Sequence, residues 1–499
     1  MNNVLEWLED SAREHPEKLA FADVDERVTW SELELRSRAV GSAIAARVEP
    51  RRPVAIYLDK SVAAICTLLG AVQAGCCYSF IDLRQPQPRV EKIAARLDPA
   101  LVIVDEQGAD QAAEMFPEGT EFVRVEEMLS QPVDEELLAA RRGQALSTDP
   151  VYINFTSGST GEPKGVAVGH ASIIDFIPVF TKTLGLTHED VFANQAPLDF
   201  DVSVKDIYGA LFLGATVHLI PREYFSIPTQ LLDYLCEREP TVLVWAVSAM
   251  CFVSIMKGFE YKVPSSVKKV IFSGEVMPVK QLNIWREFLP DATFVNVYGP
   301  TEITCNCTYF TIDRSYEPGD TIPMGRAFAN ENVFLVDAEG CEVVEPGVEG
   351  EILVGGATLA LGYYRDPERT AEAFVQNPLH HDYRDIVYRT GDLASYDDEG
   401  NLVYLSRKDH QIKHMGQRIE LGEIESAAQA VEGVEQACCL YDGIKKRILL
   451  HYAGGIDRKE LGAVLREKLP QYMVPNKIRQ HDMLPLTKNG KIDRKKLAE

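Results

Sequence analysis

Short apolar runs alternate with helix-forming stretches along most of this chain, and that alternation limits its possible folds more than any other feature. Residues 53–58, 77–82 and 101–105 read as buried strands, and residues 60–74 read as a helix between the first two. Strands that alternate with helices form parallel sheets covered by helices. We therefore predict an α/β fold with a large N-terminal domain of layered α/β subdomains.

The pattern changes in the last third of the chain. From about residue 326, strands follow one another through acidic glycine turns, which predicts a β-rich subdomain. After residue 407 the composition becomes charged, and a short α+β stretch follows. The chain has 499 residues, more than one core usually supports. We expect a large domain over residues 1–408 and a small, mobile α+β domain over residues 409–499.

Charge and hydropathy argue against several functions. The chain has 51 basic and 75 acidic residues, a net charge of −24, which disfavours a nucleic-acid partner. Its first ten residues are acidic and amphipathic, unlike a signal peptide, and it lacks a run of about 18 apolar residues that could span a membrane. The ten cysteines lack CxxC spacing, which indicates reduced thiols, and His410 and His414 lack zinc-site partners. We expect a cytoplasmic protein without a membrane partner.

Residues 155–168 form a loop suited to a polyphosphate. They read FTSGSTGEPKGVAV, with three glycines, four hydroxyl groups and one lysine between apolar stretches. Glycines let the backbone present its N–H groups to an anion, and Lys164 adds a positive charge. The P-loop of nucleotide-binding helices requires Gly-Lys followed by Ser or Thr, whereas Lys164 lies between Pro163 and Gly165. A P-loop ATPase is therefore disfavoured, and a flexible surface turn is the remaining structural alternative.

The loop resembles the ATP loop of the adenylate-forming superfamily, which comprises acyl-CoA synthetases, luciferases and adenylation domains of nonribosomal peptide synthetases. Other strings resemble the family's signatures, and they occur in the family's order. They are VTWSEL (28–33), QAGCCYSFID (73–82), NVYGPTE (296–302), YRTGD (388–392), SRKDHQIKHMGQRIE (406–420), LPQYMVP (469–475) and NGKIDR (489–494). The resemblance covers nearly the whole chain and identifies it as a member of this superfamily.

The resemblance implies that a carboxylate attacks the α-phosphate of ATP, with Mg²⁺ present, and that pyrophosphate leaves. Catalysis would depend on positioning and on cations. The catalytic residues would be Lys164, Thr301, Glu302 and Lys491, with Glu302 also the metal ligand. The nucleotide would be bound by Thr156, Ser157, Gly158, Ser159, Thr160, Gly161, Gly274, Glu275, Asn296, Tyr298, Gly299, Asp392 and Arg407. Alternatives remain: Tyr298 as a strand aromatic, Asp392 as a turn cap and Lys491 as one solvated charge of a basic tail.

The segment LDFDVSVKDIY (198–208) resembles that of the amino-acid-activating members, in which an aspartate pairs with the substrate ammonium. Asp201 would be this residue, although it could instead cap a helix beginning near Val202. By the same resemblance, Trp245 would shorten the substrate pocket and favour a small side chain. Lys205 and Asn306 would favour a polar or acidic one, unless Lys205 is solvated at the pocket mouth. The pocket would be formed by Asp201, Val202, Lys205, Trp245, Ile271, Ser273, Val297, Cys305 and Asn306.

Two subfamilies fit these motifs: D-alanine:carrier-protein ligases and stand-alone amino-acid adenylation domains. Ser273 departs from the cysteine usual in the former. The chain ends just after the last signature, so we expect transfer to the phosphopantetheine thiol of a separate carrier protein. The resemblance implies a hinge at Asp409 and a thiol tunnel beside Lys413 and Gly416. An acyl-CoA synthetase and a non-catalytic nucleotide-binding module are the alternatives; Asp201 opposes the first, and Glu302, Asp392 and Lys491 oppose the second.

Overall fold

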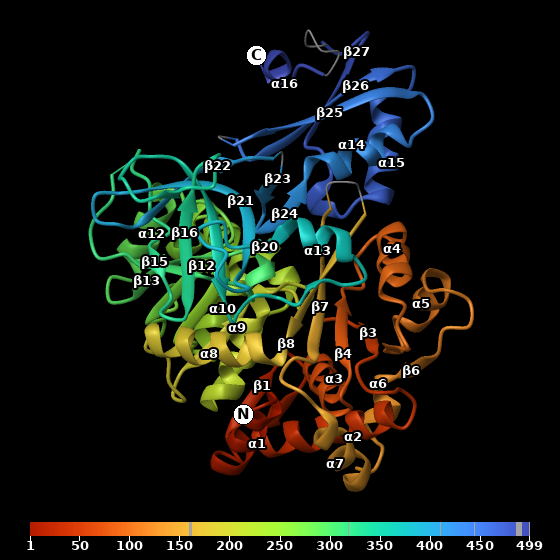
Figure 1. Cartoon of the computed structure of the whole chain (residues 1–499). Coiled ribbons are helices and arrows are strands. Elements are labelled where there is room, and N and C mark those ends of the chain that lie inside the picture. Colours follow the sequence, from red (N-terminus) through yellow and green to blue (C-terminus); the bar gives the residue numbers. More distant parts are fainter. Residues whose placement is uncertain (159–161, 318, 410, 444, 486–491, 499) are drawn as a thin grey trace.

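The computed structural model describes residues 1–158, 162–317, 319–409, 411–443, 445–485 and 492–498. They form a large α/β domain of three sheets, with a smaller α+β domain above it (Figure 1). The helices of the large domain are α1 (Leu5–Glu14), α2 (Trp30–Ala45), α3 (Val62–Gln73), α4 (Gln87–Leu97), α5 (Ala109–Met115), α6 (Val125–Leu129), α7 (Glu135–Gln144), α8 (His170–Thr183), α9 (Val202–Leu213), α10 (Pro228–Arg238), α11 (Val247–Ile255), α12 (Val279–Phe288) and α13 (Pro367–Ala373). Short 3₁₀ helices are η1 (Arg222–Ser226), η2 (Gly258–Glu260) and η3 (Thr301–Ile303).

The first sheet is built on parallel strands, as the alternating pattern predicts. In the described chain its seven strands run in the order β19 (Gly362–Tyr363), β8 (Lys164–Gly169), β7 (Pro150–Thr156), β4 (Cys77–Ile81), β3 (Pro53–Tyr57), β5 (Leu101–Val104) and β6 (Phe122–Arg124). The strands β7, β4, β3, β5 and β6 are parallel, and β8 returns antiparallel to β7. Strands β3, β4 and β5 are buried throughout, which explains their continuous apolar sequences. The predicted strands and helix in this region are confirmed to within two residues at each end.

The second sheet carries most of the substrate-side residues. Within the described residues its nine strands run in the order β15 (Arg326–Ala327), β14 (Thr308–Thr311), β13 (Thr293–Tyr298), β12 (Lys269–Ser273), β11 (Val242–Ala246), β9 (Val191–Asn194), β10 (Thr216–Leu219), β1 (Leu19–Ala22) and β2 (Arg27–Thr29). The strands from β13 to β1 are parallel, whereas β14, β15 and β2 pair antiparallel. After β2, a capping box between Thr29 and Glu32 starts α2, which explains the first motif, VTWSEL.

The third sheet is the antiparallel β-rich subdomain expected from the sequence. Its strands, as described, are β17 (Glu342–Val343), β16 (Glu331–Val336), β18 (Gly350–Gly356), β21 (Ile386–Tyr396) and β20 (Phe374–Gln376), and β22 (Leu402–Arg407) pairs with β21. The sheet begins at Glu331, because β15 at Arg326 still belongs to the second sheet. Among the described residues, no helix combines the length and apolar character needed to cross a bilayer.

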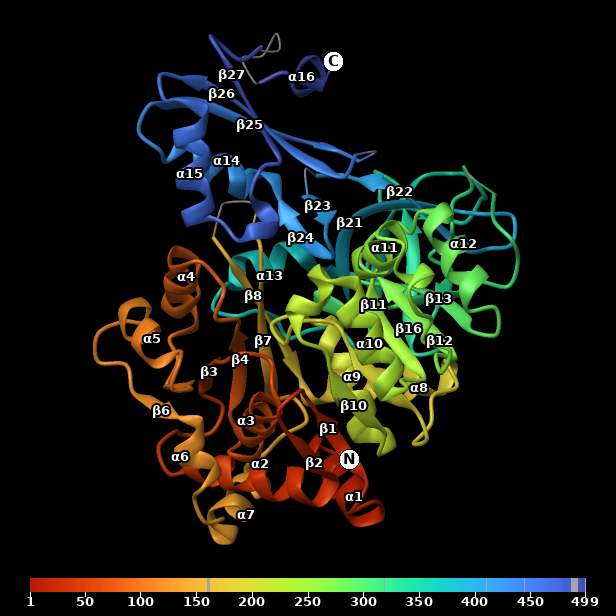
Figure 2. The same cartoon turned by 180° about the vertical axis from the view of Figure 1, so that it is seen from behind.

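The small domain has its own hydrophobic core. It contains the hairpin of β23 (Gln411–His414) and β24 (Gln417–Glu420), a sheet of β25 (Val434–Asp442), β26 (Arg447–Gly454) and β27 (Lys477–His481), and the helices α14 (Leu421–Gln429), α15 (Arg458–Lys468), η4 (Gln471–Met473) and α16 (Arg494–Ala498). Its core packs Ile424, Leu450 and Leu461 between α14, β26 and α15. In both views α15 lies above α4, and β23 and β24 reach down to the large domain (Figures 1 and 2).

Candidate active site

The phosphate loop joins the antiparallel strands β7 and β8. Thr156 at the end of β7 pairs with Lys164 at the start of β8, so the loop between them begins and ends at a fixed position. The hydroxyl of Thr156 is buried and, within the described chain, lacks a hydrogen-bond partner. This hydroxyl is free to form a hydrogen bond with a bound phosphate. Ser157 and Gly158 follow in the described chain, whereas Ser159, Thr160 and Gly161 lie outside the described residues.

Glu302 lies opposite this loop in η3 and is fully buried. Its carboxylate accepts hydrogen bonds from Arg418 at 2.7 and 3.0 Å and from the Tyr363 hydroxyl at 2.7 Å, and the Lys164 ammonium lies 3.3 Å away. Burial alone would raise the pKa of Glu302, but the cations of Arg418 and Lys164 outweigh it and hold that pKa well below its usual range. Burial lowers the pKa of Lys164 to about 8, and the Arg418 charge contributes. Glu302 is therefore a permanent buried anion that requires cations.

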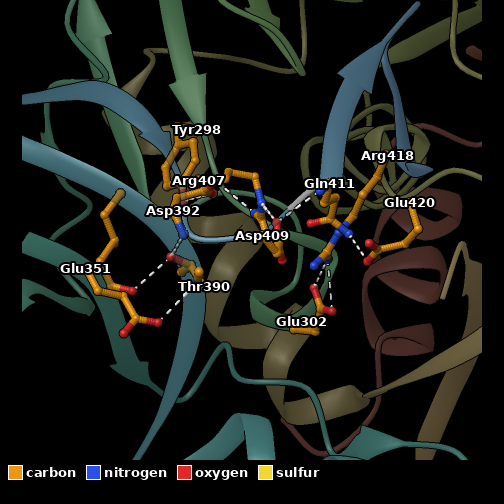
Figure 3. Close-up of polar contacts among 12 residues, drawn as sticks. Tyr298, Glu302, Glu351, Thr390, Asp392, Arg407, Asp409, Gln411, Arg418 and Glu420 are labelled. Atoms are coloured by element: carbon orange, nitrogen blue, oxygen red, sulfur yellow. Dashed lines mark hydrogen bonds and ion pairs between the residues drawn. The ribbon is translucent and has the colours of Figure 1, made fainter. Parts of the chain in front are cut away.

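A second acidic centre lies where β21, β22 and β13 meet. Asp392 and Arg407 are partners across the β21–β22 pair, and Arg407 donates to the Asp392 carboxylate at 2.8 Å (Figure 3). The Tyr298 hydroxyl donates to the other carboxylate oxygen at 2.6 Å. Arg407 also forms an ion pair with Asp409 at 2.8 Å, just before the small domain. The carboxylate of Asp392 is thus held between Tyr298 and Arg407, and its two oxygens can accept hydrogen bonds from the two hydroxyl groups of a diol.

The nucleotide-side residues border two adjoining cavities. Gly274, Asp392, Arg407 and Lys413 line both, and Glu275, Asn296 and Tyr298 line the second. Gly299 and Thr301 line the first. Gly299 is required there, because a Cβ at this position would lie 2.5 Å from the Cα of Asn306. The structure therefore brings together the described residues that the motifs assign to the nucleotide.

Asp201 lies at the first turn of α9 and lines the first cavity. It occupies the N-cap position, but its side chain makes no capping hydrogen bond within the described chain. The helix-cap alternative therefore does not account for its carboxylate. Burial raises the pKa of Asp201, while a hydrogen bond with Thr301 and the charge of Lys205 act in the opposite direction. A cation bound in the cavity beside Asp201 would stabilise its charged carboxylate and offset the effect of burial.

Lys205 and Asn306 form a buried polar pair behind the cavity. The Lys205 ammonium, in a fully buried side chain, donates to the Asn306 carboxamide oxygen at 2.8 Å. Asn306 lines the cavity with Val202 and Cys305. Cys305 has a φ of 92°, a left-handed conformation that is costly for a residue with a side chain, and its thiol donates to the backbone oxygen of Asp201. Lys205 is therefore buried, and the solvated alternative is wrong.

Trp245 does not join these residues, which corrects the expectation that it shortens the pocket. Its partner across the β11–β12 pair is Phe272, so its side chain projects from the face of the sheet opposite that of Ile271 and Ser273. There it packs edge-on against Trp285 and donates its indole N–H to a backbone oxygen of β9. Ser273 lines the cavity, while Ile271 is buried beneath it in the same cluster as Val297.

The hairpin β23–β24 of the small domain reaches the same cavities. Lys413 lies over the ring of Tyr298, 5.1 Å from its centroid. The backbone N–H of Gly416 donates to Glu275 at 2.7 Å. Gly416 has a φ of 75°, and a Cβ there would lie 2.9 Å from the Cβ of Ala246. The residues predicted for the thiol tunnel thus lie at the cavity, whereas Lys491 lies outside the described residues.

Several residues at the site have no role in the sequence interpretation, among them four with clear contacts or positions. Arg418 and Tyr363 bind Glu302, and Arg89 and Tyr472 line the first cavity. Arg418 lies inside the motif of residues 406–420, so the sequence indicates that it belongs to the site. Its contact with Glu302, 116 positions away, cannot be predicted from the sequence, because it depends on how the two domains meet.

Comparison with known proteins agrees with this geometry. The family model "AMP-binding enzyme" matches residues 8–364, and "AMP-binding enzyme C-terminal domain" matches residues 423–491. The L-proline--[L-prolyl-carrier protein] ligase of Streptomyces coelicolor is 32% identical over 99% of this chain and 96% of its own length. Bacitracin synthase 1 of Bacillus licheniformis is also 32% identical over 99% of this chain, which spans 9% of that protein.

Among solved structures, IdnL1 superimposes with a TM-score of 0.81 at 29% identity, covering 96% of this chain and 98% of that one. Both the family models and a relative matched over nearly its full length thus agree with the motifs and the site. The chain belongs to the family of AMP-binding enzymes.

Proposed function

We propose that this enzyme activates an amino acid as its aminoacyl-adenylate, releases pyrophosphate, and transfers the aminoacyl group to the phosphopantetheine thiol of a separate carrier protein. The observation that carries the proposal is Asp201, a cavity-lining carboxylate whose side chain is not used to cap α9. An ammonium group on the substrate is the natural partner of a desolvated carboxylate. The similar ligase from Streptomyces coelicolor is named for an amino acid and a carrier protein, which agrees with this proposal.

The residues present fit ATP and Mg²⁺. Asp392 would accept the ribose hydroxyls and Tyr298 would contact adenine, with Thr156, Ser157 and Lys164 at the β- and γ-phosphates. Glu302 would ligate Mg²⁺. Mg²⁺ is usually held by one or two carboxylates together with substrate phosphates and water, so a single carboxylate fits it. Bound Mg²⁺ would neutralise charge on the phosphates; Thr301 and Lys491 would stabilise the α-phosphate as the substrate carboxylate attacks.

The substrate side chain is proposed to be small or polar. Ser273 and Val202 leave space at the cavity wall, and the Lys205–Asn306 pair lies directly behind it. Substrate groups that accept a hydrogen bond from the Asn306 amide or from Lys205 would compensate these buried polar groups. Trp245 lies on the other face of the sheet. The expected short length of the substrate side chain therefore depends only on Ser273, Val202 and the Lys205–Asn306 pair. D-Alanine belongs to the amino acids with a small side chain and remains a candidate substrate.

The second half-reaction is proposed to use the present orientation of the small domain. Gly416 and Lys413 already lie at the cavity, where the hairpin would border the path of a pantetheine arm. We propose Asp409 as the hinge between residues 1–408 and 409–499, because Arg407 ties it to the large domain and it lies two positions before β23. In the first half-reaction the domain would turn so that Lys491 reaches the α-phosphate.

The test is ATP–pyrophosphate exchange with a panel of L- and D-amino acids, acetate and benzoate. Exchange that depends on an α-amino acid supports the proposal, and preference for a small or polar side chain supports the pocket assignment. Equal exchange with acetate or benzoate would indicate the alternative, an acyl-CoA synthetase. An amino-acid-dependent exchange that strongly prefers Phe, Trp or Leu would contradict the pocket assignment alone.

A further inference from the structure

Groups of the small domain occupy the places assigned to Mg²⁺ and the terminal phosphates. The Arg418 guanidinium reaches both carboxylate oxygens of Glu302, at 2.7 and 3.0 Å (Figure 3). The backbone oxygen of Arg418 accepts a hydrogen bond from the Ser157 hydroxyl at 2.6 Å. The strand β24 thus supplies a cation to Glu302 and a backbone acceptor to Ser157 of the phosphate loop.

These contacts exclude a metal ion at the same carboxylate. Glu302 is fully buried, and Lys164 and Tyr363 contact it besides Arg418. A divalent cation on either oxygen would lie in direct contact with the Arg418 guanidinium, and like charges repel strongly where water is excluded. Without a cation from the small domain or from solution, the buried carboxylate of Glu302 would lose much of the positive charge that stabilises it. Glu302 therefore suits either Arg418 or Mg²⁺, but not both.

We propose that Arg418 is the cation that replaces Mg²⁺ on Glu302, so that docking of the small domain and binding of Mg²⁺–pyrophosphate exclude each other. This inference rests on the proposed function, because pyrophosphate is the product of its first half-reaction. The new element is the charge of Arg418, which competes directly with Mg²⁺ for the carboxylate of Glu302. Arg418 acts here as a positioning residue of the small domain.

Contacts away from Glu302 also hold the small domain against the large one. Variants of these contacts can therefore test the competition between docking and Mg²⁺ binding without changing Glu302. Arg89 of α4 and Glu423 of α14 form a buried ion pair at 3.0 Å, with 6% and 9% of their side chains exposed. Glu275 accepts from the Gly416 N–H and forms an ion pair with Lys446 at 3.4 Å. Because binding equilibria are linked, any variant that weakens docking raises the affinity for a ligand that requires the undocked state.

The test is calorimetric titration of the full-length enzyme with Mg²⁺ and inorganic pyrophosphate. Arg418→Met is expected to bind Mg²⁺–pyrophosphate about tenfold more tightly than the unmodified protein, as for a docked state that holds about nine molecules in ten. Arg89→Met, which removes the ion pair with Glu423 and leaves Glu302 and Arg418 unchanged, is expected to shift the affinity in the same direction. Arg447→Met, at an exposed position of β26, is the matched control and should leave the affinity unchanged.

The sign of the change decides between the models. If Arg418 instead bound the phosphates, Arg418→Met would weaken binding, and this outcome, or an unchanged affinity, overturns the proposal. In a Glu302→Gln background the effect of Arg418→Met should largely disappear, because the shared carboxylate charge is gone. As a second measurement, saturating Mg²⁺–pyrophosphate should increase hydrogen–deuterium exchange of residues 411–420; unchanged exchange contradicts the proposal. Amino-acid-dependent ATP–pyrophosphate exchange, measured separately, shows whether the proposed function itself fails.

Discussion

We propose that Asp201 is the residue that distinguishes amino acids from other carboxylic acids. Its carboxylate lines the cavity and has its pKa raised by burial, so it gains most from a positive partner. We predict that Asp201→Ala lowers kcat/KM in pyrophosphate exchange by the equivalent of about 2–5 kcal/mol, because a desolvated ammonium loses its partner. Asp291→Ala, at an exposed position, is the control. A loss below tenfold would remove Asp201 from the binding of the amine.

We propose Lys491 as a second residue, one whose role separates the two half-reactions. We predict that Lys491→Ala slows adenylate formation by roughly 10²–10³-fold, the scale for removing one preorganised charge from a developing anion. Thioester formation from preformed aminoacyl-adenylate should be retained, because the proposed second step uses the hairpin β23–β24 at the cavity and does not require Lys491. Lys488→Ala, from the same basic stretch, is the matched control. Normal exchange by Lys491→Ala would make Lys491 one solvated charge among several.

At the scale of elements, the strands and their parallel pairing were more predictable than the faces that their side chains present. The buried strands β3, β4 and β5 follow from continuous apolar runs, and the start of α2 follows from Thr29 and Glu32. Trp245 shows the limit, because a shift of one residue in the β11–β12 register would move its side chain to the other face. The contact between Arg418 and Glu302 also escapes local patterns, since it forms only where two domains meet.

The hairpin β23–β24 yields a prediction at this scale. Gly416 adopts a φ of 75° and approaches Ala246 so closely that a Cβ would lie 2.9 Å away. We predict that Gly416→Leu lowers the rate of thiol transfer at least tenfold, while pyrophosphate exchange is lowered far less, because only docking of the hairpin is obstructed. Single-turnover measurement of each half-reaction checks this. Gly443→Leu, where a Cβ meets nothing within 4 Å, is the control. Equal loss of both half-reactions in Gly416→Leu would indicate misfolding instead.

The whole molecule combines a strongly acidic surface with a site that concentrates cations. The net charge of −24 contrasts with Lys164, Arg407, Lys413 and Arg418 around the two cavities. Anionic substrates must therefore enter a locally positive site within a protein whose overall charge repels them. Lys164 and Arg418 contact Glu302 in η3, whereas Arg407 contacts Asp392 in β21 of the third sheet. Assembly of the site thus requires all three sheets of the large domain and the hairpin of the small one.

Buried histidines predict how the stability of the large domain depends on pH. Burial, with a contribution from Arg142, lowers the pKa of His170 to about 4, and burial, with Arg238, lowers that of His218 to about 4. His170 accepts a hydrogen bond from the backbone N–H of Val4, which ties α1 to α8. As the pH falls below about 6.5, the unfolded chain takes up protons that the folded chain refuses, so stability declines until about pH 4.

Between pH 7 and pH 5 each of these histidines should therefore remove about 2 kcal/mol from the free energy of unfolding, from 1.36 kcal/mol per pKa unit. Urea unfolding of the unmodified protein, His170→Gln and His218→Gln at both pH values checks this. Each variant is expected to lose about 2 kcal/mol less than the unmodified protein across this interval, because glutamine does not titrate. His188→Gln, at an exposed position, should keep the full pH dependence. The same dependence in all four proteins would show that His170 and His218 titrate normally in the folded state, and that other groups set the acid limit of this fold.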